Sequence, residues 1–333
     1  MKQKIGAFLG SPWGQRSVIL AIILVIMGIF QRRFFLGANL SSILLAIAIY
    51  GIMAAGMLFT VLVGGMDLSV GSMAGLAASI TYLFAQSDSF SNAGFLKGFL
   101  AAMLVCVVVG YFHGTLVTAV GIPAFVVTLA TKYILTGTVQ LVTGGRFVNL
   151  EGTGLAAQIG NAKVAGIPMP VIILFAYIII CSFVLMKTTF GRRLYAIGGN
   201  SVASRLVGIK TSGNIKIAYI VSSVSAGIGG IVLGSLNMIA GQTTAMGYEG
   251  NVLMAMVVGG INLAGGEGGV PGAIFGALLV GVINNVMNLL GVSSDFQKFV
   301  QGIIILAAVI LNMYTKRRSQ GLVEQRGEKK AKA

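Results

Sequence analysis

Charged side chains are scarce in this sequence. Only 9% of its 333 residues are Asp, Glu, Lys or Arg, whereas 56% are hydrophobic, and the mean hydropathy is +0.93. A water-soluble domain carries about a quarter charged residues. This chain has too few to cover a water-facing surface, so the scarcity excludes an ordinary soluble protein and predicts an integral membrane protein.

Residues that perform enzyme chemistry are also few. The single histidine, His113, falls in an apolar run, where we interpret it as packed or hydrogen-bonded. The two cysteines lie far apart, which excludes a disulfide framework or a cysteine metal site. The sequence has no Gly-x-x-x-x-Gly-Lys-Ser/Thr loop for nucleotide phosphates. We therefore predict a non-catalytic chain without a cofactor of its own.

Carboxylates are rare in the apolar segments. Asp67 is one, and Glu249 and Glu267 fall near the ends of apolar runs. A proton or sodium pump is expected to keep several ionisable groups at mid-membrane depth. The pattern favours a passive conduit that is driven by another protein.

Long apolar runs fill the remainder of the sequence. A helix needs about 20 mostly apolar residues to cross a bilayer. We predict an all-α polytopic membrane protein of about ten transmembrane helices, at 16–31, 39–63, 68–85, 98–120, 123–142, 169–187, 216–237, 251–264, 271–292 and 298–314. Glycine clusters near 64–71 and 259–271 leave tight turns, broken helices and re-entrant backbone open as alternatives there.

The positive charge lies beside the apolar runs. The net charge is +15, but this placement suits a lipid bilayer rather than nucleic acid. With the N-terminus inside, 16 of the 23 Lys and Arg residues fall on the cytoplasmic side and six outside, with Lys132 within a span. This bias predicts that both termini are cytoplasmic. We expect a single transmembrane domain over 1–315, with a cytoplasmic loop at 188–215, and a disordered basic tail over 316–333.

Two glycine-rich stretches resemble each other. Val63-Gly-Gly-Met-Asp-Leu-Ser-Val-Gly71 is similar to Val258-Gly-Gly-Ile-Asn-Leu-Ala-Gly-Gly266. Transporters are often built from repeated halves. Chance similarity between two Gly/Val-rich stretches is the alternative, and both stay open.

The stretch GRRLYAIGGNSVASRLVGIK over 191–210 is short, basic and interrupted by glycine. Asn200 is a favoured N-cap, and Gly208 suits the left-handed end of a helix. The sequence thus predicts a two-turn helix over Ser201–Val207. Such a short helix needs a surface to be stable, and the membrane interface and a groove in a partner protein are both open.

Four motifs, in order, resemble a known family. In chain order they are Gly64-Gly-Met-Asp-Leu-Ser-Val-Gly71, Ile122-Pro-Ala-Phe-Val-Val-Thr-Leu129, Phe190-Gly-Arg-Arg-Leu-Tyr-Ala-Ile-Gly-Gly-Asn200 followed by Ala203 and Gly208-Ile209, and Val258-Gly-Gly260 with Gly265-Gly-Glu-Gly-Gly-Val-Pro-Gly272. The similarity runs from about Asn39 to Asn312. These motifs resemble permease subunits of the ribose/galactose-type, or simple-sugar, ABC importers.

The resemblance implies an ABC importer permease fold and an uptake pathway for a simple sugar or related polyol in the plasma membrane of a bacterium, the inner membrane if it has two. It implies a second permease copy, identical or different, an extracytoplasmic sugar-binding protein and a separate ATP-binding subunit at the cytoplasmic face. The short helix would be the coupling helix that docks on this ATPase. The residues expected there are Arg192, Arg193, Asn200, Ala203, Arg205, Leu206, Gly208 and Ile209.

A neutral, hydroxyl-rich sugar needs scattered polar groups along its conduit. The candidates are Asp67, Ser69, Thr128, Thr131, Lys132, Asn284, Asn285 and Asn288. Thr128, Thr131 and Lys132 share one helical face. Asp67 could instead cap a helix that starts at Leu68, and the asparagines could instead join helices.

The outer loops offer Arg33, Arg146 and Lys163 to an acidic rim of the binding protein, with ordinary solvated loop charge as the alternative. Two rival functions also stay open. One is a permease of the same superfamily for another solute, such as a branched-chain amino acid, a nucleoside or an autoinducer. The other is an ion-coupled secondary transporter.

Overall fold

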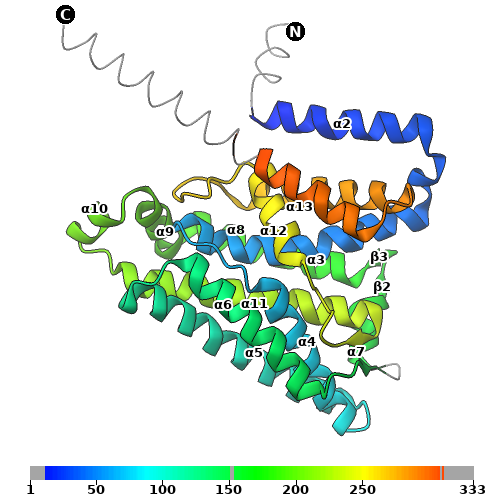
Figure 1. Cartoon of the computed structure of the whole chain (residues 1–333), viewed down its shortest axis with the longest axis horizontal. Helices are drawn as coiled ribbons and strands as arrows, with labels where there is room; N and C mark the ends of the chain where they lie inside the picture. The colour runs from blue at the N-terminus through cyan, green and yellow to red at the C-terminus, as the bar shows by residue number, and fades with distance from the viewer. Residues whose placement is uncertain (1–11, 151–153, 308–309, 311–333) are drawn as a thin grey trace, which may run out of the picture.

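Helices make up most of the computed structural model, which describes residues 12–150, 154–307 and 310 (Figure 1). The predicted tail over 316–333 lies outside the described residues. The helices are α2 (Pro12–Phe30), η1 (Arg32–Phe35), α3 (Gly37–Leu62), α4 (Val70–Ser87), α5 (Asn92–Thr115), the π turn η2 (Leu116–Val120), α6 (Ala124–Thr143), α7 (Leu155–Asn161), α8 (Met169–Lys187), α9 (Thr189–Gly199), α10 (Ser201–Leu206), α11 (Thr211–Asn237), α12 (Tyr248–Val258) and α13 (Val270–Leu289). A further helical stretch covers 294–307.

Four two-residue strands complete the described elements. β1 (Val148–Asn149) pairs antiparallel with β4 (Ile239–Ala240), and β2 (Lys163–Val164) pairs antiparallel with β3 (Ile167–Pro168). All four lie in connections between helices, so the prediction of a helical protein is confirmed.

Six described helices are long and apolar enough to cross a membrane: α3, α5 with η2, α6, α8, α11 and α13. The apolar part of α2, Leu20–Phe30, and α12 are shorter. The predicted span 251–264 was wrong at its end, because α12 stops at Val258. The predicted span 68–85 starts later, since α4 begins at Val70. Gly64 (φ +79°) and Gly260 (φ +72°) adopt left-handed backbone in these two breaks, which ends the regular helix.

Two helices, α3 and α11, form the centre of the bundle. In the most apolar 18-residue window of each helix, 83% of the α3 residues and 72% of the α11 residues are buried. Small residues allow this close approach. A Cβ on Gly56 of α3 would lie 1.9 Å from the Ser225 hydroxyl of α11, and a Cβ on Gly230 of α11 would lie 2.1 Å from the Ala74 carbonyl oxygen of α4. Backbone therefore packs directly on neighbouring helices at these crossings.

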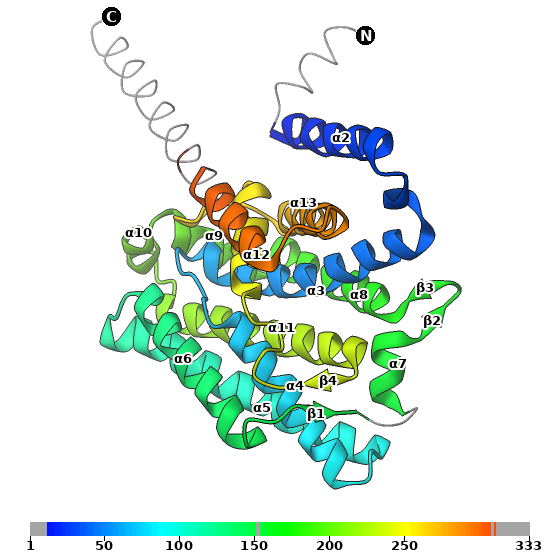
Figure 2. The same cartoon turned by 45° about the vertical axis from the view of Figure 1, so that its right-hand side comes forward.

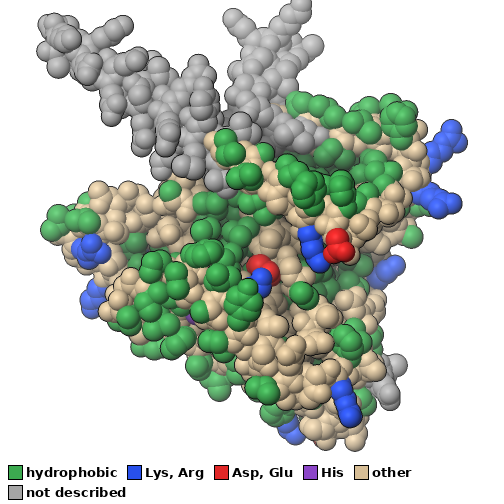
Figure 3. All heavy atoms as spheres, viewed as in Figure 1, with side chains coloured by type: hydrophobic (Ala, Val, Ile, Leu, Met, Phe, Trp, Pro, Cys, Tyr) green, Lys and Arg blue, Asp and Glu red, His purple; other side chains and the backbone are tan. Residues whose placement is uncertain are grey.

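The outer helices α5, α6 and α8 keep their apolar side chains exposed. Only 28% of the residues in each apolar window are buried. In the face seen in Figure 3, hydrophobic side chains spread over the middle of the molecule, and Lys and Arg lie mainly toward its two ends. An apolar belt between basic ends is the surface expected of a protein that sits in lipid.

The two ends of the molecule carry different structures. α9 and α10 lie at one end, and α7, β2 and β3 lie at the other (Figure 1), an arrangement that the turned view in Figure 2 also shows. We refer to these as the α10 end and the hairpin end. The predicted coupling residues and Lys163 of β2, one of the predicted receptor-docking residues, therefore lie at opposite ends.

The Gly230 contact yields a stability prediction. Gly230→Ala should lower the free energy of unfolding by about 1–3 kcal/mol, because the added methyl overlaps the α4 backbone. Gly137→Ala in α6 is the matched control, since no heavy atom lies within 4 Å of its added Cβ. Thermal melting of the detergent-purified chain measures both, and equal melting temperatures would contradict the packing argument.

Candidate coupling helix and polar path

The short helix at the α10 end is fixed by its predicted cap. The Asn200 Oδ1 accepts hydrogen bonds from the backbone N–H groups of Val202 (3.0 Å) and Ala203 (2.9 Å). Gly208 follows with φ +82°, as predicted for a left-handed end. α10 covers Ser201–Leu206, one residue shorter than predicted. The predicted cytoplasmic loop over 188–215 contains α9, α10 and the first turn of α11, which begins at Thr211.

α10 presents an uncovered apolar surface. Leu206 is 84% exposed and Val207 is 77% exposed, and Val202 is also exposed. Ile209 is half-buried and Ser204 is buried against the protein. The other predicted coupling residues, Arg192, Arg193, Ala203 and Arg205, are exposed around this surface. The predicted set thus shares one end of the molecule, with apolar and basic groups both accessible.

Three backbone segments meet directly beside α10, in what we call the glycine junction: Gly64, Gly198, Gly199, Gly265 and Gly266. The Gly266 N–H donates to the Leu62 carbonyl oxygen at 2.9 Å. A Cβ on Gly198 would lie 1.8 Å from that same oxygen, and one on Gly265 would lie 2.8 Å from the Gly64 nitrogen. The end of α9 is therefore in backbone contact with the α3–α4 break and the α12–α13 break.

Two aromatic contacts hold α9 against the same breaks. The Tyr195 hydroxyl donates to the Gly268 carbonyl oxygen at 2.8 Å. Burial raises the pKa of the Tyr195 phenol, so the hydroxyl stays protonated and able to donate at neutral pH. Phe190 stacks on Phe59 of α3 with ring centroids 6.2 Å apart. Because of these two contacts, a displacement of α9 would also displace α3 and the 259–269 loop.

Asp67 ties the α3–α4 break to α11. Its Oδ1 accepts from the Ser69 N–H (3.0 Å) and hydroxyl (2.6 Å), and its Oδ2 accepts from the Ser222 hydroxyl (2.7 Å). Asp67 does not cap a helix at Leu68, because the helix starts at Val70 and Ser69 occupies the N-cap position. The carboxylate is fully buried, so its bonds join two segments of the same chain.

A buried polar group of α5 and α11 side chains surrounds this carboxylate. The His113 ring lies edge-on to the Tyr219 ring, with centroids 6.0 Å apart. Within the described residues, both His113 nitrogens, the Tyr219 hydroxyl and the Ser223 hydroxyl have no hydrogen-bond partner. His113 is therefore packed rather than hydrogen-bonded to protein. Buried polar atoms of this kind usually bind ordered water.

The face predicted for α6 divides between two environments. Thr128 donates to Ala124 O (2.9 Å) and to Met66 O (3.2 Å), which joins α6 to the α3–α4 break. Thr131 is buried and donates to Val127 O at 2.9 Å, within its own helix. Lys132 reaches across to Glu249 of α12, with Nζ and Oε1 2.7 Å apart. Lys132 thus faces protein, as its cost in lipid requires.

The predicted asparagines make contacts between helices. Asn284 Nδ2 donates to Asn251 Oδ1 of α12 at 3.0 Å, and Asn285 Nδ2 donates to Asn39 Oδ1 of α3 at 2.8 Å. Asn288 Oδ1 accepts from Gln297 Nε2 at 2.8 Å. These contacts favour the joining role, and they do not bring the asparagines together with Asp67 or Lys132.

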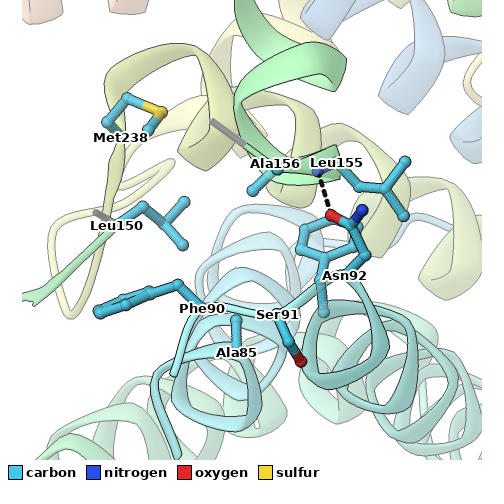
Figure 4. A pocket seen from close by; sticks show the side chains of 10 residues that line it. Ala85, Phe90, Ser91, Asn92, Leu150, Leu155, Ala156 and Met238 are labelled. Atoms are coloured by element: carbon cyan, nitrogen blue, oxygen red, sulfur yellow. Dashed lines mark hydrogen bonds between the residues drawn. The ribbon is translucent and has the colours of Figure 1, made fainter. Parts of the chain in front are cut away.

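The hairpin end carries the residues predicted to meet a receptor. Arg33 in η1, Arg146 before β1 and Lys163 in β2 are all exposed. Figure 4 shows how this end is fastened: Asn92 points to α7, and its Oδ1 accepts from the Leu155 N–H at 2.7 Å. Phe90, Leu150 and Met238 line the small pocket beside this bond. The α4–α5 turn therefore fixes where α7 lies.

A family model described as "Branched-chain amino acid transport system / permease component" matches residues 39–309. The chain belongs to this permease family. Among curated relatives, the ribose import permease of Bacillus subtilis is 36% identical over 311 residues, which covers 93% of this chain and 92% of that protein.

Further members of the permease family carry other sugar names. The L-arabinose transport system permease protein of Escherichia coli K12 is 35% identical and covers 92% of this chain and 93% of its own length. The D-allose transport system permease protein of the same strain is 33% identical, over 88% of this chain and 89% of its own length. No solved structure gave a significant match.

Several polar residues of this permease escaped the sequence analysis. Ser222 binds Asp67 from 155 positions away, and Tyr50 lies beside Asn251 and Asn284. Gln140 Nε2 donates to Gln242 Oε1 at 2.7 Å. Glu249 was recognised only as a carboxylate near a span end. No local spacing marks such long-range pairs, although the rarity of carboxylates in apolar segments was a usable signal for Glu249.

The glycine junction yields the second prediction. Gly198→Ala should displace α9, because its added methyl overlaps the Leu62 carbonyl, whereas Gly199→Ala has open space and should behave like the native permease. Limited trypsin digestion after Arg192 and Arg193 measures the displacement, and cleavage should be faster only in Gly198→Ala. Identical digestion of the two variants would refute the backbone contact.

Proposed function

We propose that this chain is the membrane-spanning permease subunit of an ATP-driven importer for a simple sugar. The similarity to permeases named for ribose, L-arabinose and D-allose, over about nine tenths of each chain, carries the proposal. The chain itself performs no catalysis and holds no cofactor, and ATP is bound and hydrolysed by a separate subunit.

The α10 end would face the cytoplasm and the hairpin end the outside. Lys187, Arg192, Arg193, Arg205 and Lys210 all belong to the α10 end. Basic residues next to spans are retained on the cytoplasmic side. In this orientation both termini are cytoplasmic, and about ten helices over 1–315 cross the plasma membrane of the bacterium as a single unit.

α10 would dock in a groove of the ATPase subunit. The exposed Leu206, Val207 and Val202 supply the apolar contact, and Arg205 supplies charge at its rim. Closure of the ATPase pair then pushes on α10 and α9. The glycine junction passes this push to both helix breaks at once, since backbone touches backbone there and no side chain can absorb the movement.

The outer partner would be an extracytoplasmic sugar-binding protein that rests on the hairpin end, with Arg33, Arg146 and Lys163 as its charged contacts. A second permease copy would complete the pathway. Among the predicted path residues, Asp67, Ser69 and Thr128 lie at or beside the α3–α4 break, and Thr131 and Lys132 lie farther along α6.

A branched-chain amino acid is the second candidate substrate. The family description names this solute class. A zwitterion needs opposite charges along its path, and the Lys132–Glu249 pair presents both. Uptake by wild-type transporter of labelled D-ribose, L-arabinose, D-allose and L-leucine decides between the two, and we expect a sugar to be taken up.

Leu206→Asp tests the coupling role. A charge on this exposed side chain should abolish copurification with the ATPase subunit and leave membrane insertion intact, because an apolar groove excludes an unpaired carboxylate. Val164→Asp, on an exposed valine at the hairpin end, should copurify like the native chain. Undiminished association of Leu206→Asp would remove the proposed docking.

The energy source gives a further prediction. Sugar uptake in cells should continue after an uncoupler collapses the ion gradients while ATP is maintained, and it should stop when ATP is depleted. The reverse pattern is that of an ion-coupled secondary transporter and would overturn the proposal.

A further inference from the structure

The chain leaves helical geometry between α11 and α12, over 238–247. Met238 (φ +55°), Ala245 (φ +58°) and Gly247 (φ +83°) all adopt left-handed backbone there. Non-glycine residues rarely do so, and such strain is concentrated at functional sites. α12 has 11 residues and is about 16 Å long, so the helix is shorter than a bilayer core and would cross it only together with the adjoining irregular segment.

This irregular segment packs against the first turns of α4. A Cβ on Gly71 would lie 2.8 Å from the Ala245 carbonyl oxygen, and a Cβ on Gly75 would lie 2.8 Å from the Thr244 carbonyl oxygen. Non-helical backbone within a membrane survives only against protein or beside water. The two glycines of α4 satisfy the first condition, and they also line a polar pocket between α4, α6 and this segment.

The pocket is lined by hydroxyl-binding groups. Ser72, Thr136, Gln242 and Thr244 contribute, together with the ion pair of Lys132 and Glu249. Lys132 is the ninth of 20 residues in α6, so the pair sits midway along a spanning helix. Glu249 lies in the first turn of α12, where the helix dipole favours a carboxylate. Ionisable pairs at such depth mark solute pathways.

The pocket is closed to a sugar in this structure. Its volume is about 30 Å³, which is room for about one water molecule. The Lys132 and Glu249 side chains remain partly exposed, at 33% and 13%, so their contact lies at the edge of the pocket.

We propose that this pocket binds the hydroxyl groups of a sugar in transit, and that the Lys132–Glu249 pair is a gate that separates to admit it. The carboxylate accepts from hydroxyls and the ammonium donates to them, so the sugar replaces the bonds that the open pair loses. Exchange of one set of bonds for another keeps the binding weak enough for release. The inference rests on the proposed sugar-importer function.

The first test neutralises both partners at once. The double variant Lys132→Gln with Glu249→Gln keeps the side-chain size and leaves no unpaired charge, so the protein should fold. Complete transporter with its ATPase and binding protein is reconstituted in proteoliposomes with labelled D-ribose, L-arabinose or D-allose. We expect at least a tenfold loss of uptake, with ATP hydrolysis within twofold of wild type.

Neutralisation of another ion pair is the matched control. Lys97→Gln with Asp88→Asn removes an exposed pair of 3.2 Å at the hairpin end and should leave uptake unchanged. Uptake within twofold of wild type in the Lys132/Glu249 double variant would overturn the gate while the importer function stands. Wild-type uptake of L-leucine but of none of the three sugars would overturn the proposed function and with it the sugar site.

The second test measures access to the pocket by chemical labelling and does not measure uptake. Thr136→Cys lines the pocket, whereas Ile134→Cys is 63% exposed on the apolar outer face of α6. Cys106 and Cys181, both buried, are first replaced by Ala. A charged, membrane-impermeant thiol reagent should label Thr136→Cys during turnover with ATP and be slowed by the transported sugar. It should not label Ile134→Cys, and failure to label Thr136→Cys in any state would overturn the proposal.

Discussion

Direct contact between backbones at the glycine junction is the constraint on which the rest of this structure depends. The Leu62 carbonyl oxygen accepts the Gly266 N–H, and Gly198 lies so near it that a methyl group would not fit. Side chains can change rotamer to relieve a displacement, but backbone atoms in contact cannot. The α9 segment and the two helix breaks are therefore obliged to move together, which is the property that a chain driven from one end requires.

Two carboxylates inside the described bundle, Asp67 and Glu249, lie where helical geometry is interrupted. Asp67 sits in the α3–α4 break and is bound by Ser69 and Ser222. Glu249 begins α12, directly after the irregular 238–247 segment, and meets Lys132. An interrupted helix exposes N–H and C=O groups that stabilise charge, and a charge in turn stabilises the interruption. The two features occur together for this physical reason.

Local patterns in the sequence predicted local structure well. Asn200 and Gly208 bounded α10 to within a residue, because capping depends on side chains only a few positions apart. The α12 bound was wrong, since apolar composition continues past Val258 while the turn is imposed by glycine backbone and by contact with Gly272. The Asp67–Ser222 bond and the Lys132–Glu249 pair depend on how distant helices pack, and neither spacing nor hydropathy encodes that.

The two similar glycine-rich stretches, 63–71 and 258–266, prove to be neighbours in space, since Gly64 and Gly265 touch.

The exposed Leu206 and Val207 of α10 have a consequence for the permease before it is assembled. Hydrated apolar surface costs free energy in proportion to its area. A permease made without its proposed ATPase would carry this cost and would adhere to other apolar surfaces. Balanced synthesis of the two subunits would therefore protect the cell from a permease without its ATPase. The exposed surface of α10 thus limits how much permease a cell can safely make in excess of its partner.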